Sequence, residues 1–191
     1  MQAARLLAGQ LNAVNFLLHD VAGRLEPEEW LRRAAPTTNV PAFTLWHVAR
    51  VLDSSIQMSI RGEAELIEKE PWVSKAWARQ STGVGYSLAE ADELAALVVP
   101  DEIVEYADAS RSSTNQWLKT ITDDVLEAEN RIIEHAGKHP AYNYPASLEA
   151  IAWTAGRPVW AVLSIACFAH TWGHLEEIAL LAVAARASAS T

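Results

Sequence analysis

The chain has 191 residues, 50% of them hydrophobic, and a formal net charge of −9. This length and apolar content predict one globular domain over residues 1–186, followed by a disordered tail over 187–191. The acidic balance, which no basic block offsets, argues against nucleic acid or an anionic membrane as a partner.

The first predicted element is an amphipathic helix over residues 3–25, where apolar side chains recur at three- and four-residue spacing. A proline-containing connection follows over 26–40. The second helix is predicted over 42–61, because Pro41 suits a first-turn position and Gly62 suits a helix end.

This second helix carries two apolar faces, which consist of Leu45, Ala49, Leu52, Ile56 and Ile60 on one side and Phe43, His47, Val51, Ser54 and Met58 on the other. A helix that is apolar on two sides packs against two neighbours. We hypothesise that one neighbour is a second copy of the chain. Arg50 and Asp53 lie on the polar strip between the faces, where their spacing favours a surface ion pair. Alternatively, Arg50 holds an acidic group of a substrate.

In the middle of the chain, the sequence pattern predicts several short helices and a third long helix. Ser87 opens a short helix through a capping box, and the long helix covers 100–121. The connection over 122–157 should hold short elements, one of them over 123–135. Its aromatic residues are expected either to cover a pocket mouth or to form a small satellite core: Tyr142, Tyr144 and Trp153.

The most informative stretch is an apolar helix predicted over 157–185, which carries His170 and His174. Residues four apart on a helix lie about 40° apart around the axis and about 6 Å apart along it, so both imidazoles can bind one metal ion. Their apolar neighbours place them on the face expected to point into the core, where polar groups need partners. Glu177 lies on the same face. It is expected to contact a metal-binding residue, to be a distant metal ligand itself, or to form a salt bridge. The alternative is a pair of core histidines held by hydrogen bonds.

The residue after the first histidine is Thr171, so this is not the zincin motif, which has a glutamate there. His47 adds a third histidine on an apolar helix face, and three histidines with an open position are typical of catalytic zinc sites. His135 and His139 also lie four apart, but the intervening glycine and the following proline interrupt a helix. Four long helices joined by short ones predict an all-α protein, specifically a four-helix bundle.

Cysteine content and hydropathy indicate the compartment. The one cysteine, Cys167, permits no disulfide within the chain, and its apolar neighbours predict a small core residue. No apolar run is long enough to span a bilayer, and the N-terminal residues lack a signal-peptide pattern. We therefore expect a cytoplasmic protein with no membrane partner.

Two motifs resemble the DinB/YfiT-like superfamily of metalloenzymes. One is the W-H-x-A-R-x-x-D pattern over 46–53, and the other is H-x-x-x-H-L-E-E-I over 170–178. The stretches W-A-R at 77–79 and G-V-G-Y-S at 83–87 resemble its actinobacterial, mycothiol-dependent-like branch. Glu176 departs from the family pattern, which has a small residue there, and this departure concerns packing near the site.

The resemblance implies a four-helix bundle that dimerises and binds a divalent metal ion, zinc or nickel, through His47, His170 and His174. Some relatives are S-transferases or isomerases that use mycothiol or bacillithiol as co-substrate. The chain would then be a metal-dependent transferase or hydrolase acting on a small electrophile, with Glu177 or Asp53 accepting a proton. Two alternatives remain open: a metal-binding stress-response protein without catalysis, and a dimeric helical scaffold whose histidines merely pack.

Overall fold

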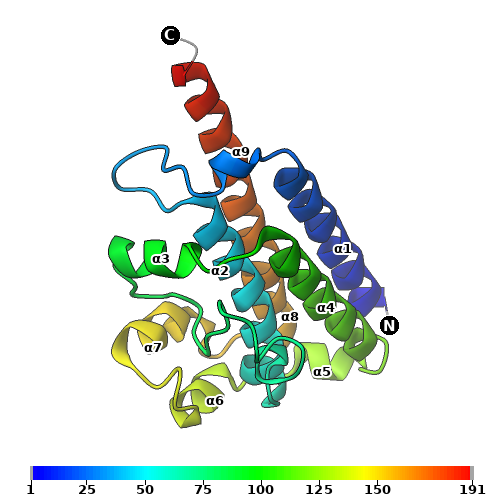
Figure 1. Ribbon diagram of the computed structural model, residues 1–191. Helices are drawn as coiled ribbons and strands as arrows, with labels where there is room; N and C mark the ends of the chain where they lie inside the picture. The colour runs from blue at the N-terminus through cyan, green and yellow to red at the C-terminus, as the bar shows by residue number, and fades with distance from the viewer. Residues whose placement is uncertain (1, 190–191) are drawn as a thin grey trace.

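The computed structural model describes residues 2–189, and within that range the chain forms helices and no β-strand (Figure 1). Its longest helices are α1 (Gln2–Gly23), α2 (Pro41–Ser54), α4 (Pro100–Leu118) and α9 (His170–Ala189). A π-helical segment, Ser55–Arg61, prolongs α2. Helix α8 (Val159–Val162) and a second π-helical segment, Leu163–Ala169, lead directly into α9. The predicted all-α class is confirmed.

The sequence signals for helix ends hold in the structure. Pro41 and Pro100 occupy first-turn positions of α2 and α4. The capping box of Ser87 opens α3 (Leu88–Ala95). Gly62 ends the π-helical prolongation of α2 with a φ of 67°, a left-handed conformation that glycine adopts without steric cost.

The long helices pack side by side around one core. Helix α1 lies against α4 and α9, and α2 lies against the same two helices. In Figure 1, α1 and α9 run toward one end of the molecule and α2 and α4 run toward the other. Fully buried side chains from these helices form the centre of the core: Leu18, Leu45, Trp46, Ile103 and Leu175. No helix within residues 2–189 is both long and apolar enough to cross a membrane.

The single element predicted over 123–135 is wrong. The chain forms α5 (Asp123–Glu127) and α6 (Ile132–Lys138) there, and α7 (Pro145–Ile151) follows. The amide side chain of Asn130 explains the break, because it donates hydrogen bonds to the carbonyls of Thr154 and Arg157. These contacts come from residues far along the chain, so local periodicity cannot reveal them.

The expected disordered tail is also partly wrong, because α9 continues to Ala189. Its last turns are rich in alanine, the residue with the highest helix propensity. Residues 190 and 191 lie outside the described part of the chain.

The second apolar face of α2 is covered within the chain. Phe43 packs beside the loop at Gly83, and Met58 lies in a small cluster with Ala136 and Tyr142. The prediction that a partner subunit covers this face therefore loses its basis. The strip of Arg50 and Asp53 is not on the surface either, since both side chains are fully buried.

Gly83 makes this close packing possible. Its φ is 82°, and a Cβ atom built there would lie 2.8 Å from Cζ of Phe43 and 3.0 Å from a ring carbon of Trp46. We expect Gly83→Ala to lower the free energy of unfolding by about 2 kcal/mol or more, through backbone strain and overpacking. The matched control is Gly9→Ala in α1, where a Cβ meets nothing within 4 Å; it should stabilise by up to about 1 kcal/mol. Urea unfolding measures both, and equal effects would contradict the packing argument.

Candidate metal centre

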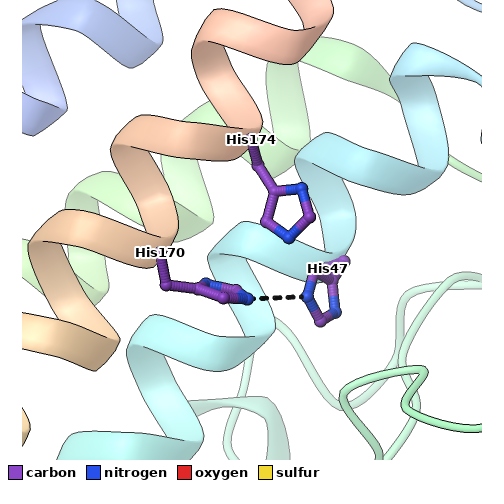
Figure 2. Close-up of side chains that lie close together, drawn as sticks. All are labelled: His47, His170 and His174. Carbon is purple, nitrogen blue, oxygen red and sulfur yellow. Dashed lines mark hydrogen bonds between the residues drawn. The ribbon is translucent and has the colours of Figure 1, made fainter.

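Three histidines converge between α2 and the start of α9. His47 comes from α2, and His170 and His174 come from the first two turns of α9. One ligand nitrogen from each lies within 4.8 Å of the others, and Figure 2 shows the three rings turned toward one another. The ring centroids are separated by 5.1, 5.1 and 4.6 Å. The structure thus brings together the predicted ligand set.

The Nε2 atoms of His47 and His170 are 3.2 Å apart. Two nitrogens bound tetrahedrally to one zinc ion at about 2.0–2.1 Å lie about 3.3 Å apart. The spacing therefore suits a shared ion. It also suits a hydrogen bond between the two rings. The protonation of the two Nε2 atoms decides whether the pair binds a metal ion or forms that hydrogen bond.

Partners on the outer ring nitrogens fix two of the tautomers. His47 donates its Nδ1–H to the carbonyl of Thr82, which can only accept. His174 Nδ1 lies 3.1 Å from a carboxylate oxygen of Glu177, which is an acceptor when ionised. Both rings consequently keep a lone pair on Nε2. Carbonyl and carboxylate partners of this kind orient metal-binding histidines and raise their basicity as ligands.

His170 is the histidine without such a partner. Its Nδ1 is buried, and no hydrogen-bond partner for it exists within residues 2–189. Without a metal, only an Nε2–H on His170 could donate to His47, which would leave Nδ1 as an unsatisfied buried acceptor. An Nδ1–H tautomer would instead direct a third Nε2 lone pair at the centre. The residues present therefore fit a three-nitrogen metal site.

Electrostatics keep the two more buried imidazoles neutral at pH 7. Burial lowers the pKa of His170 to about 3, and the neighbouring His47 and His174 add to this effect. Burial also lowers the pKa of His47 to about 4, although the hydrogen bond to Thr82 opposes the shift. A metal ion would thus meet lone pairs rather than protons on both rings.

The histidines sit at the edge of the core and not on the core face that the sequence indicated. The residues of this helix that are buried in the core are Cys167, Thr171, Leu175 and Ile178. His170 and His174 lie about 60–100° around the helix from that row. The π-helical segment before His170 changes the number of residues per turn, so a stripe drawn at 3.6 residues per turn does not continue through it. Burial raises the pKa of the Cys167 thiol to about 12, which fits a core residue.

Asp53, a predicted proton acceptor, lies in a buried hydrogen-bond network on the same helix as His47. Its carboxylate accepts from the backbone N–H groups of Leu66 and Ile67 at 3.0 and 3.1 Å, from Arg50 at 3.1 Å, and from the Tyr106 hydroxyl. It does not line the cavity beside the histidines. These contacts give Asp53 a structural role. Glu177, the other predicted acceptor, is 43% exposed at its side chain and contacts the triad through His174.

Arg50 occupies the centre of that network. Besides Asp53 it binds Glu65, the hydroxyls of Tyr106 and Tyr142, and the carbonyls of Arg79 and Ser81. Every nitrogen of its guanidinium group has a protein partner, so the hypothesis that Arg50 receives an acidic substrate group finds no free donor.

The remaining histidines lie elsewhere. His19 contacts Asp108 of α4 at 3.1 Å, His135 bonds to the carbonyl of Ser59 at 2.7 Å, and His139 lies 3.5 Å from Glu68. Within residues 2–189 no fourth histidine, cysteine or carboxylate joins the three-histidine group. An ion held there would keep at least one position for another ligand.

A cavity of about 180 Å³ adjoins His47 and His170. Its walls come from both π-helical segments, from α6 and α7, and from the turn that follows α7. Tyr142 and Trp153, aromatic residues of the 122–157 connection, line it, and Tyr144 does not. Sequence periodicity could not locate this cavity, because distant parts of the chain form it: residues 47–59, the loop at 82–84, and residues 132–170.

A scan against models of known protein families finds no match for the chain, and a search of curated proteins finds no relative. The resemblance to the DinB/YfiT-like superfamily therefore rests on the quoted residues alone and stays a prediction.

Substitutions at the two carboxylates separate their roles. Asp53→Asn should lower the free energy of unfolding by about 3–5 kcal/mol, because it breaks a buried ion pair, and should leave zinc affinity unchanged. Glu177→Gln should change stability by no more than about 0.5 kcal/mol and weaken zinc binding about 10- to 100-fold. Urea unfolding and zinc titration against a competing chelator measure the two quantities. The reverse pattern would make Asp53 part of the site and Glu177 part of the scaffold.

Proposed function

We propose that the chain is a DinB/YfiT-like four-helix bundle and a metal-dependent enzyme acting on a small molecule. His47, His170 and His174 would hold one divalent ion, zinc or nickel, since imidazole suits both. The single observation that carries the proposal is the convergence of one ring nitrogen from each of three histidines, with the Nδ1 atoms of His47 and His174 held by Thr82 and Glu177. The proposed compartment is the cytoplasm.

When bound, such an ion supplies a Lewis acid that lowers the pKa of a thiol or water in its open position. The proposed reaction is S-transfer from a thiol such as mycothiol or bacillithiol, or a related isomerisation. In S-transfer the sulfur forms a bond to the electrophilic carbon, and the leaving group departs with the electrons of its own bond. The thiol proton needs an acceptor. Glu177 is the proposed one, because its carboxylate is solvent-accessible and lies beside His174.

The neutral pair of His47 and His170 supports this reading over that of packed core histidines. Two neutral rings can share only one hydrogen bond through their facing Nε2 atoms, whereas a metal ion would use the lone pairs of both. His170 Nδ1 has no partner within the described residues in either case. Among residues 2–189 no fourth protein ligand joins the group, which favours catalysis over a purely structural ion, since a structural ion normally has four protein ligands. A metal-binding stress-response protein without catalysis is the alternative.

Metal content tests the site. Untagged wild-type protein and His135→Ala should each carry about one equivalent of zinc or nickel by plasma mass spectrometry, and His170→Ala should carry none. His135 is the matched control because it is also half-buried but binds Ser59 outside the triad. Absence of metal from all three proteins after reconstitution would refute the site. Metal binding without thiol-dependent consumption of any electrophile would favour the stress-response alternative.

A homodimer is proposed on a different observation. Helices α1 and α9 are neighbours, and on them Phe16, Leu180 and Val183 are 76%, 70% and 63% exposed. Over residues 178–185 helix α9 carries only apolar side chains, so its side facing away from the core is apolar there as well. A second copy of the chain would remove these side chains from water.

Light scattering at micromolar concentration should give the mass of two chains for the wild type. Phe16→Glu combined with Leu180→Glu should give the mass of one chain, because carboxylates in an apolar interface lose their hydration without a partner. The control is Leu31→Glu, which alters a side chain of 57% exposure in a connecting segment. A monomeric wild type would count against the dimer and the scaffold alternative together.

A further inference from the structure

The cavity beside the histidines has a wall without charged side chains. Its lining carries neither lysine, arginine, aspartate nor glutamate among the described residues. Apolar side chains dominate it, including Met58, Ile132, Ala136, Ile151, Val162 and Ala166. A charged ligand group that entered would lose its hydration without gaining a counter-ion, at a cost of several kcal/mol. The wall therefore favours an uncharged, largely apolar ligand.

The nearest large charge cluster is closed off from the cavity. Tyr142 lines the cavity, but its hydroxyl accepts a hydrogen bond from Arg50 at 2.9 Å. Arg50 lies behind this tyrosine, is fully buried, and has partners on all its nitrogens. The guanidinium group therefore offers nothing to a carboxylate in the cavity.

Hydroxyl groups in the wall provide limited polar recognition. The hydroxyls of Thr154 and Ser54 already donate to the backbone carbonyls of Ile151 and Val51. Ser55 and Ser147 also line the cavity, and within residues 2–189 neither hydroxyl has a side-chain or backbone partner in the hydrogen-bond network. One or two polar groups on a ligand could be satisfied there.

The volume sets the size of the ligand. An engineered apolar cavity of about 150 Å³ binds benzene, and this one measures about 180 Å³. It accommodates a single ring with a small substituent. A sugar-containing thiol is too large and too polar, so it would have to reach the histidines from outside the cavity.

We infer that the cavity binds a small neutral aromatic or branched aliphatic group, and that this group is the apolar part of the electrophile. The assignment as substrate rests on the proposed function, because His47 and His170 belong to both the cavity wall and the candidate metal centre. Binding itself depends only on the wall. The binding of an apolar group and its assignment as substrate can therefore be refuted separately.

The test compares toluene with benzoate, two probes of similar shape that differ in charge. Isothermal titration of the full chain, in metal-free and zinc-loaded form, should show one toluene bound per chain in both forms. Benzoate should bind the metal-free form at least about tenfold more weakly, because its carboxylate has no partner in the wall. The charge comparison uses the metal-free form alone, since zinc at the histidines would bind a carboxylate. Equal binding of the two probes by the metal-free form, or no binding of toluene by either form, would overturn the inference.

Cavity-filling variants locate the binding. Ala150→Leu adds volume at an exposed position of the lining and should weaken toluene binding at least about tenfold by occupying the space. Ala136→Leu, at a buried position of the lining, is the second filling variant. Ala152→Leu is the matched control, since Ala152 is exposed, two residues away, and outside the lining. Unchanged binding in both filling variants would place toluene elsewhere and refute the inference. If the chain binds toluene but takes up no metal, the inference that the cavity binds an apolar group holds, and only the proposed function is refuted.

Discussion

The buried guanidinium group of Arg50 is the constraint on which the site depends. It pairs with Asp53 of the same helix and joins α2 to Glu65, to Tyr106 of α4, and to the carbonyls of Arg79 and Ser81. A charge removed from water is tolerated only when its hydrogen-bond donors are all used. The segment around residues 79–83 is therefore held against α2, and the next carbonyl along it, that of Thr82, orients His47. The ion network thus supports the segment that orients His47 without itself contacting the histidines.

The two π-helical segments have a comparable role on the cavity side. One follows His47 by two turns, and the other ends immediately before His170. Both contribute to the cavity wall, and they contact each other. A π-helical turn is wider than an α-helical turn and is frequent at functional sites. In this protein it turns His170 away from the core row of its helix and toward the cavity.

The buried apolar side chains form a large core and a separate small cluster. Helices α1, α2, α4 and α9 share the large core, whereas α6, α7 and Tyr142 cover the cavity with a separate small cluster. Fewer buried contacts hold the second part, and lower local stability is usual where ligands enter. The histidines lie between the large core and the small cluster. An ion bound to them would have the large core on one side and the cavity wall on the other.

The sequence by itself determined the helical class, several ends of the long helices and the three histidines that the structure brings together. Prolines at 41 and 100, Gly62 and the Ser87 capping box act through local backbone geometry, and the four-residue histidine spacing needs only one helix. The tertiary structure alone decided the burial of Arg50, the break at Asn130, the change of register before His170, and the cavity. Each of these depends on partners distant in sequence, such as Thr154 for Asn130 and Arg79 for Arg50, or on helical turns that depart from the 3.6-residue period. Local periodicity contains no information about such partners, and this is why Asp53 appeared from sequence as a surface residue and a candidate acid–base group.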